Sequence, residues 1–177
     1  ALMCGKGDLV AVEAVRGRFF KLRENLQQHG APFVHTVQAG GEWLWKRWRE
    51  RFDAVLLDAP CSSESRFRTD DPTTFRYWSL KKIGDMVRKQ KSRLYSAIQC
   101  LKPGGRLVYC TCTFAPEENE GIIAHALKKF GGRVEVVPIT VEVEGMVPAL
   151  DEWGGRVYPE SVRHARRILP SETMEGF

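Results

Sequence analysis

The chain has 177 residues, 43% of them hydrophobic, which is enough for one domain with a buried core. Its 27 Lys and Arg outnumber 22 Asp and Glu, and the net charge of +5 favours an anionic partner, nucleic acid above all. No apolar stretch approaches the about 18 residues that a membrane span requires, and the start ALMCGKGDLV is too short and polar for a signal peptide. We therefore expect a cytoplasmic protein, or a nuclear one in a eukaryote, whose five cysteines are free thiols.

Short apolar runs alternate with segments of helical periodicity along most of the chain. We predict strands at 8–13, 34–39, 53–57, 106–111 and 134–139, helices at 14–29, 79–101 and 117–130, and a helix or turn at 42–52. The turn Lys102-Pro103-Gly104-Gly105 follows the longest helix, and Gly131-Gly132 stops the last one. This alternation indicates one domain over residues 1–177, built on a parallel α/β sheet whose ligands bind at the carboxyl ends of the strands.

Three of the predicted strands end in polar or thiol side chains. Glu13 ends the first strand, Asp58 and Cys61 follow the third, and Cys112 ends the fourth. The single helix between the third and fourth strands suggests that they are neighbours, about 4.8 Å apart. Two thiols and a carboxylate are then expected at one crevice. Cys110 should share a face with Cys112 if the strand continues that far.

Two motifs at these strand ends carry a resemblance to a known family. DAPCSS (58–63) and YCTCTFAPEENE (109–120) resemble the signatures of the Sun family of RNA (cytosine-5) methyltransferases, and so do VAVE, FDAVLLDAPCS and LKPGGRLVY. The resemblance implies a Rossmann-like class I methyltransferase fold, a mostly parallel sheet with helices on both faces. It also implies S-adenosylmethionine as methyl donor and an RNA substrate, ribosomal RNA slightly favoured over transfer RNA. Cys112 would be the nucleophile, and Cys61 would aid product release.

The chemistry explains why such a site needs a thiol. Carbon 5 of cytosine is too weak a nucleophile to take a methyl group unaided, but a thiolate added at carbon 6 makes it reactive. Cys112 would supply that thiolate, and Asp58 would hydrogen-bond the ring edge and contact the methyl donor. The base must be unstacked to be reached, which favours single-stranded or remodelled RNA.

The methyl-donor half of the site is less complete in this sequence. Glu13 is expected to accept hydrogen bonds from the ribose hydroxyls of the cofactor. Gly40 stands where the family usually has an Asp for the adenine amine, and no Gly-rich donor loop is found. The resemblance therefore implies a partial domain, with its first and last strands missing or truncated. It also implies a gap between the strands that end at Glu13 and Asp58, and weak cofactor binding by the chain alone.

Two other functions compete with this one. In a DNA cytosine-5 methyltransferase the Pro-Cys thiol, Cys61, would be the attacking group. A non-catalytic RNA-binding module could keep both thiols without transferring a methyl group.

Other residues have plainer interpretations. Cys110 and Cys112 lack the spacing and further ligands of a zinc site, so no metal is expected. Cys4 and Cys100 are interpreted as bystanders, and Glu117 and Glu118 as acids in the first turn of a helix. A basic group around the PCS loop either contacts RNA phosphates or forms a solvated face; it comprises Arg66, Arg68, Arg76, Lys81 and Lys82.

Overall fold

The computed structural model describes residues 7–171 and 176–177; Cys4 lies outside them. In chain order it contains β1 (Val10–Glu13), α1 (Arg16–Gln28), β2 (His35–Gln38), η1 (Gly41–Trp43), α2 (Trp45–Trp48), β3 (Phe52–Asp58), η2 (Glu64–Arg66), η3 (Pro72–Thr74), α3 (Leu80–Cys100), β4 (Leu101–Cys110), α4 (Glu120–Phe130), η4 (Gly131–Arg133), β5 (Met146–Pro148), β6 (Glu152–Trp153), β7 (Arg156–Val157), η5 (Glu160–His164) and β8 (Arg166–Ile168). None of the described helices is long and apolar enough to cross a membrane.

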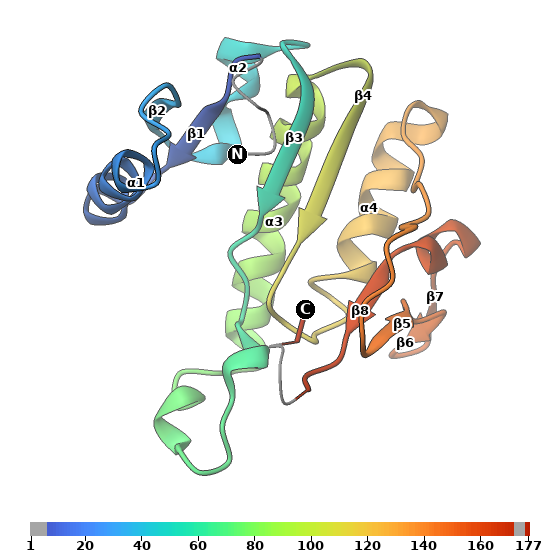
Figure 1. Cartoon of the computed structure of the whole chain (residues 1–177). Helices are drawn as coiled ribbons and strands as arrows, with labels where there is room; N and C mark the ends of the chain where they lie inside the picture. The colour runs from blue at the N-terminus through green and yellow to red at the C-terminus, as the bar shows by residue number, and fades with distance from the viewer. Residues whose placement is uncertain (1–6, 172–175) are drawn as a thin grey trace.

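The first four strands form two separate parallel pairs (Figure 1). β1 pairs with β2, so that Glu13 lies opposite Gln38, and β3 pairs with β4, so that Asp58 lies opposite Cys110. Within the described residues no hydrogen-bonded ladder joins one pair to the other. The gap expected between the strands that end at Glu13 and Asp58 is therefore present.

The pairing of β3 with β4 contains one irregularity, at the glycine turn. Phe52 lies opposite Leu101, but Ala54 lies opposite Arg106, so residues 102–105 bulge out of the ladder. Gly104 has a φ of +76°, the left-handed region that glycine adopts without strain. β4 thus begins at Leu101, five residues before the strand predicted at Arg106.

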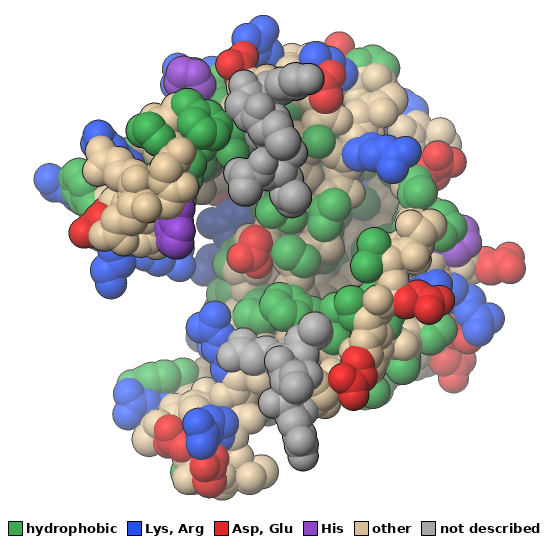
Figure 2. All heavy atoms as spheres, viewed as in Figure 1, with side chains coloured by type: hydrophobic (Ala, Val, Ile, Leu, Met, Phe, Trp, Pro, Cys, Tyr) green, Lys and Arg blue, Asp and Glu red, His purple; other side chains and the backbone are tan. Residues whose placement is uncertain are grey.

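α3 begins where the sequence predicts and covers one face of β3 and β4. The Ser79 hydroxyl caps it by accepting a hydrogen bond from Lys82 N at 3.1 Å. Leu94 of α3 packs with Ile122 of α4 in a core that also contains Leu57 and Leu107. On the opposite face Leu56 and Val108 are 71% and 59% exposed, and Figure 2 shows hydrophobic side chains over these strands.

Two predicted elements after β4 differ from the structure. Residues 134–139 form no strand, because Pro138 lacks an N–H and no described strand lies beside them to complete a ladder. α4 begins at Glu120 rather than at residue 117, because residues 115–119 form a tight turn in which Glu118 N donates to Ala115 O. The glycine stop after α4 is as predicted, with Gly131 at a φ of +56°.

A buried ion pair joins the C-terminal part of the chain to the start of α4. β8 pairs antiparallel with β5, and Arg167 of β8 donates to both Glu120 carboxylate oxygens, at 2.7 and 2.6 Å. The two side chains are 11% and 1% exposed. Arg167 also donates to Phe114 O at 3.0 Å. The pair therefore holds β8, α4 and the loop after β4 together.

We predict that Arg167→Ala lowers the free energy of unfolding by about 3 kcal/mol or more, because Glu120 is left as a buried, unpaired charge. Urea denaturation of the variant and the parent protein measures the difference. Arg163→Ala is the matched control, since Arg163 pairs with Asp151 at 3.0 Å but both side chains are 57% exposed. It should cost about 1 kcal/mol at most. Equal losses for both variants would contradict the assignment.

Candidate active site at the ends of β3 and β4

The two motif thiols meet at the carboxyl edge of the β3–β4 pair. Cys61 lies in the loop after β3 and Cys112 in the loop after β4, and their sulfur atoms are 3.1 Å apart. Both are free thiols. Cys112 N also points at Cys61 Sγ, at 3.3 Å. Because the strands are parallel neighbours, residues 51 positions apart in the sequence come into contact.

Hydrogen bonds between the two loops fix this approach. The hydroxyls of Ser62 and Thr113 are 2.6 Å apart, and both residues are buried. Ser65 donates to Cys112 O from its backbone N–H at 3.2 Å and from its hydroxyl at 3.0 Å. Ser63, in the same loop as Cys61, has a φ of +63°, in the left-handed region that tight turns use. The loops therefore form one hydrogen-bonded unit rather than two independent segments.

Glu118 lies beneath both loops, fully buried. Its carboxylate accepts hydrogen bonds from Ser62 N at 3.1 Å and from Gln90 Nε2 of α3 at 2.7 Å. Gln90 Nε2 also donates to Pro60 O at 2.9 Å. Burial raises the pKa of Glu118 more than these hydrogen bonds lower it. The interpretation of Glu118 as an acid in the first turn of a helix is wrong, because the residue precedes α4 and supports the Cys61 loop.

The protonation of the thiols depends on their burial. Desolvation and the neighbouring Cys112 thiol raise the pKa of Cys61 to about 11. Cys61 thus keeps its proton at neutral pH. Burial also raises the pKa of Cys110, with a further contribution from the Asp58 carboxylate.

Asp58 and Cys110 lie beside the thiol pair but do not bond to it. Asp58 is exposed, and its Oδ1 is 4.0 Å from Cys110 Sγ. β4 ends at Cys110, and only Cys112, beyond the end of the strand, reaches Cys61. Cys100 is buried at the end of α3, as a bystander would be.

Glu13 lies at the carboxyl end of β1, in the other strand pair. Its Oε1 accepts hydrogen bonds from Val15 N at 2.7 Å and Arg18 Nη2 at 3.0 Å. Burial raises the pKa of Glu13, but these bonds outweigh it and the net shift is downward. A backbone hydrogen bond from Ala14 also lowers the pKa of Glu13. The Glu13 carboxylate is thus held at the carboxyl end of β1 by backbone donors and by Arg18.

The carboxyl group of Glu42 lies where a side chain at Gly40 would begin. A Cβ on Gly40 would lie 2.7 Å from Oε1 of Glu42. A side chain at position 40 would therefore require Glu42, a flexible residue, to shift. Glu42 Oε2 is buried and lacks a hydrogen-bond partner among the described residues, although Arg93 Nε lies 3.7 Å away. Sequence reasoning missed this acceptor, because nothing in the spacing marks Glu42.

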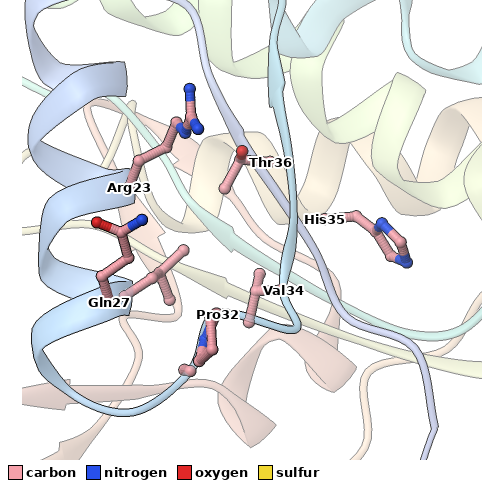
Figure 3. A pocket seen from close by; sticks show the side chains of 8 residues that line it. Arg23, Gln27, Pro32, Val34, His35 and Thr36 are labelled. Atoms are coloured by element: carbon pink, nitrogen blue, oxygen red, sulfur yellow. The ribbon is translucent and has the colours of Figure 1, made fainter.

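A cavity of about 270 Å³ lies away from these residues, between the end of α1 and the start of β2 (Figure 3). Its lining includes Arg23, Gln27, Val34 and Thr36. It opens at the amino end of β2, whereas ligands of parallel sheets bind at the carboxyl ends. None of the predicted site residues lines it.

The whole chain, residues 1–177, matches the family described as 16S rRNA methyltransferase RsmB/F. It is 36% identical over 170 residues to a tRNA (cytosine(49)-C(5))-methyltransferase of Pyrococcus abyssi, covering 96% of this chain and 53% of that protein. It is 42% identical over 135 residues to the ribosomal RNA small subunit methyltransferase F of Aeromonas salmonicida, covering 74% and 27%. The chain thus spans about half the length of the first relative, and less of the second.

A solved structure of a methyltransferase homolog from Pyrococcus horikoshii superposes with a TM-score of 0.81, at 32% identity. The superposition covers 99% of this chain and 52% of that one, which confirms the Rossmann-like methyltransferase fold. Family, relatives and fold agree with the motifs at the ends of β3 and β4. The chain belongs to the RsmB/F family of RNA methyltransferases, as its resemblance to the Sun family predicted.

Proposed function

We propose that the protein methylates carbon 5 of a cytidine in RNA, with Cys112 as the attacking thiol and S-adenosylmethionine as methyl donor. The observation that carries the proposal is the contact between Cys61 and Cys112, whose sulfur atoms are 3.1 Å apart at the ends of neighbouring parallel strands. The family description and the relatives named for ribosomal and transfer RNA support an RNA substrate. Ribosomal RNA is slightly favoured, because the family is described by it.

The two thiols would act in sequence. Cys112 loses its proton and its sulfur bonds to carbon 6 of the base, which places an electron pair at carbon 5. S-adenosylmethionine supplies an electrophilic methyl group when it is bound. The electron pair at carbon 5 bonds to that methyl group. Solvent then removes the proton from carbon 5, and the electrons of the broken C–H bond re-form the ring double bond as the Cys112 sulfur departs. Cys61, with a pKa of about 11, still carries a proton that it can share with the departing sulfur.

The matched family also disfavours a DNA cytosine-5 methyltransferase, in which Cys61 would be the attacking thiol. Burial raises the pKa of the Cys61 thiol, whose sulfur lies 3.1 Å from that of Cys112. The matching family is one of RNA methyltransferases. A non-catalytic RNA-binding module is separated from the enzyme by the adduct test below.

Carboxylates at the ends of β1 and β2 fit a nucleoside cofactor in part. Glu13 at the end of β1 would accept hydrogen bonds from the ribose hydroxyls. Glu42 Oε2 would accept from the adenine amine, since it is buried and has no hydrogen-bond partner among the described residues, although Arg93 Nε lies 3.7 Å away. Asp58, exposed at the end of β3, would contact the donor and the ring edge of the base. Carboxylate oxygens accept hydrogen bonds from hydroxyl and amine groups.

The first prediction concerns the covalent adduct. Cys61→Ala should accumulate a protein–RNA adduct that survives denaturing electrophoresis, because the thiol that assists release is gone. Cys112→Ala should form none. The measurement uses the natural protein that contains these residues, a cytidine-containing RNA and S-adenosylmethionine. The opposite pattern would indicate attack by Cys61, and an absence of adduct and methylated RNA in every form would favour the non-catalytic module.

The second prediction concerns the cofactor. Glu13→Ala should weaken S-adenosylmethionine binding about ten-fold or more, because hydrogen bonds to a charged acceptor are lost. Calorimetric titration of the same natural protein measures the dissociation constant. Glu24→Ala is the control, since Glu24 is exposed on α1 and accepts one hydrogen bond from within the described residues, from Gln28 Nε2 at 3.4 Å. Equal dissociation constants for both variants would remove Glu13 from the cofactor site.

Glu118 is proposed as a positioning residue for the thiols. It touches neither sulfur, but it holds Ser62, next to Cys61, and Gln90, which in turn holds Pro60. Removing the carboxyl group would leave the Ser62 N–H and one Gln90 donor buried without an acceptor. Such groups cost about 1–3 kcal/mol each. The Cys61 loop would then lose its fixed position relative to Cys112.

The third prediction for this site therefore compares two substitutions. Glu118→Ala should slow RNA methylation by at least about ten-fold, while Glu118→Gln keeps an acceptor oxygen and most of the rate. Because the pKa of Glu118 is raised, its contribution to folding stability is full at acid pH and falls as pH rises through that pKa. The melting temperature of Glu118→Gln relative to the parent should thus increase with pH from about 4 to 8.

Glu117→Gln provides the control, because Glu117 is exposed and bonds to Trp153 Nε1 at 3.0 Å. It should change neither the methylation rate nor the pH dependence of melting. If Glu118→Ala methylates RNA as fast as the parent protein, Glu118 has no part in positioning the thiols.

A further inference from the structure

Residues 64–79 form an arm between β3 and α3 that projects from the body of the molecule (Figure 1, green). The arm contains η2 and η3 and three of the five basic residues around the PCS loop: Arg66, Arg68 and Arg76. Its aromatic side chains Phe67, Phe75, Tyr77 and Trp78 are all more than a third exposed. Such a combination of rings and cations is typical of surfaces that bind single-stranded nucleic acid.

The base of the arm is tied to the loop that carries Cys112. Glu64 accepts hydrogen bonds from Trp78 Nε1 at 2.7 Å and from Phe114 N at 3.1 Å, so it joins both ends of the arm to that loop. Ser65 donates to Cys112 O, as described above. The position of the arm relative to the attacking sulfur is therefore set by direct hydrogen bonds.

Most of the arm's polar and aromatic groups hold the arm itself. Phe67 packs against Phe75 and Trp78, with ring centroids 5.6 and 6.4 Å apart. Asp71 caps η3 by accepting from Thr73 N at 3.0 Å. Arg68 forms an ion pair with Asp70, with Nη2 and Oδ2 2.7 Å apart. These contacts give the arm a defined shape and leave few groups for a ligand.

Arg66, Arg76 and Tyr77 are the groups that remain, and Arg76 lies beside Tyr77. The Arg76 guanidinium lies 4.5 Å from the centroid of the Tyr77 ring, and Tyr77 is 72% exposed. Within the described residues no carboxylate forms an ion pair with Arg76. The pair thus presents an exposed ring and an unpaired cation on the arm, whose base Glu64 ties to the Cys112 loop.

We propose that Arg76 and Tyr77 bind an unpaired nucleotide adjacent to the target cytidine, with its base stacked on the Tyr77 ring and its phosphate at Arg76. The inference rests on the proposed function. A cytidine that is unstacked to reach Cys112 leaves the neighbouring base without a stacking partner. An exposed aromatic ring replaces that partner, and a guanidinium neutralises the phosphate between the two nucleotides.

The test measures affinity for a short single-stranded RNA containing one cytidine, by fluorescence anisotropy with the natural protein. Tyr77→Ala should weaken binding at least about five-fold, and Tyr77→Phe should bind as the parent does, because it keeps the ring. Arg76→Ala should lower the slope of log affinity against log salt by about 0.7, the value for one phosphate contact to a single strand.

A second RNA isolates the stacking contact. When the nucleotides flanking the cytidine lack their bases, the affinity of the parent protein should fall by the same factor that Tyr77→Ala loses on the intact RNA. The affinity of Tyr77→Ala should fall little further on this second RNA. The control is Phe20→Ala on α1, another exposed ring beside an arginine, with Arg16 5.9 Å from its centroid. It should bind both RNAs as the parent does.

The outcomes separate this inference from the proposed function. If Cys61→Ala forms the Cys112 adduct but Tyr77→Ala binds both RNAs with the affinity of the parent, the arm is not a nucleotide site. If Tyr77→Ala weakens binding by the same factor on the intact and the abasic RNA, base stacking on Tyr77 is overturned. If Cys61→Ala forms no adduct and the parent methylates no RNA, yet Tyr77→Ala weakens binding only to the intact RNA, the proposed catalysis fails while the binding site stands.

Discussion

The parallel pairing of β3 with β4 is the constraint on which the rest of this site depends. Register places Asp58 opposite Cys110, so the two loops that follow leave the sheet at the same edge and in the same direction. From there a few residues of each loop suffice to bring Cys61 and Cys112 together, although 51 positions separate them in the sequence. A shift of the register by two residues would move one loop by more than 6 Å relative to the other, since a strand advances about 3.3 Å per residue.

Buried hydrogen bonds convert this approximate placement into a defined site. The Ser62 and Thr113 hydroxyls join the loops above, Glu118 and Gln90 support them from below, and Glu64 joins the Cys112 loop to the arm. A buried carboxylate is costly unless its oxygens are hydrogen-bonded, and the raised pKa of Glu118 reflects the part of that cost that remains. Desolvation also raises the pKa of the Cys61 thiol. The burial of the loops thus shifts the pKa of Glu118 and of Cys61 in the same direction.

The cofactor and base halves of the proposed site are connected less directly. Glu13 and Glu42 follow strands of the β1–β2 pair, whereas both thiols follow strands of the β3–β4 pair, and no ladder links the pairs within the described residues. The contact between them runs instead through η1, which packs on α3 and brings Glu42 within 3.7 Å of Arg93. The carboxylates of Glu13 and Glu42 lie with the β1–β2 pair, whereas the two sulfur atoms and the arm lie with the β3–β4 pair.

Several features could be predicted from the sequence: the alternation of strands and helices, the start of α3, the glycine stop at Gly131 and the two thiol motifs with their family. Each is a local property, set by periodicity, turn chemistry or a short contiguous pattern. Other features depended on contacts between distant segments. Residues 134–139 have the composition of a strand but no partner among the described strands. Glu118 and Glu42 look like ordinary polar positions until Glu118 is seen buried against Ser62 and the Glu42 carboxyl group is seen against Gly40. Burial and hydrogen-bond partners arise only when the chain is folded, so it took the folded chain to show which acids support the site and that burial raises the pKa of the Cys61 thiol.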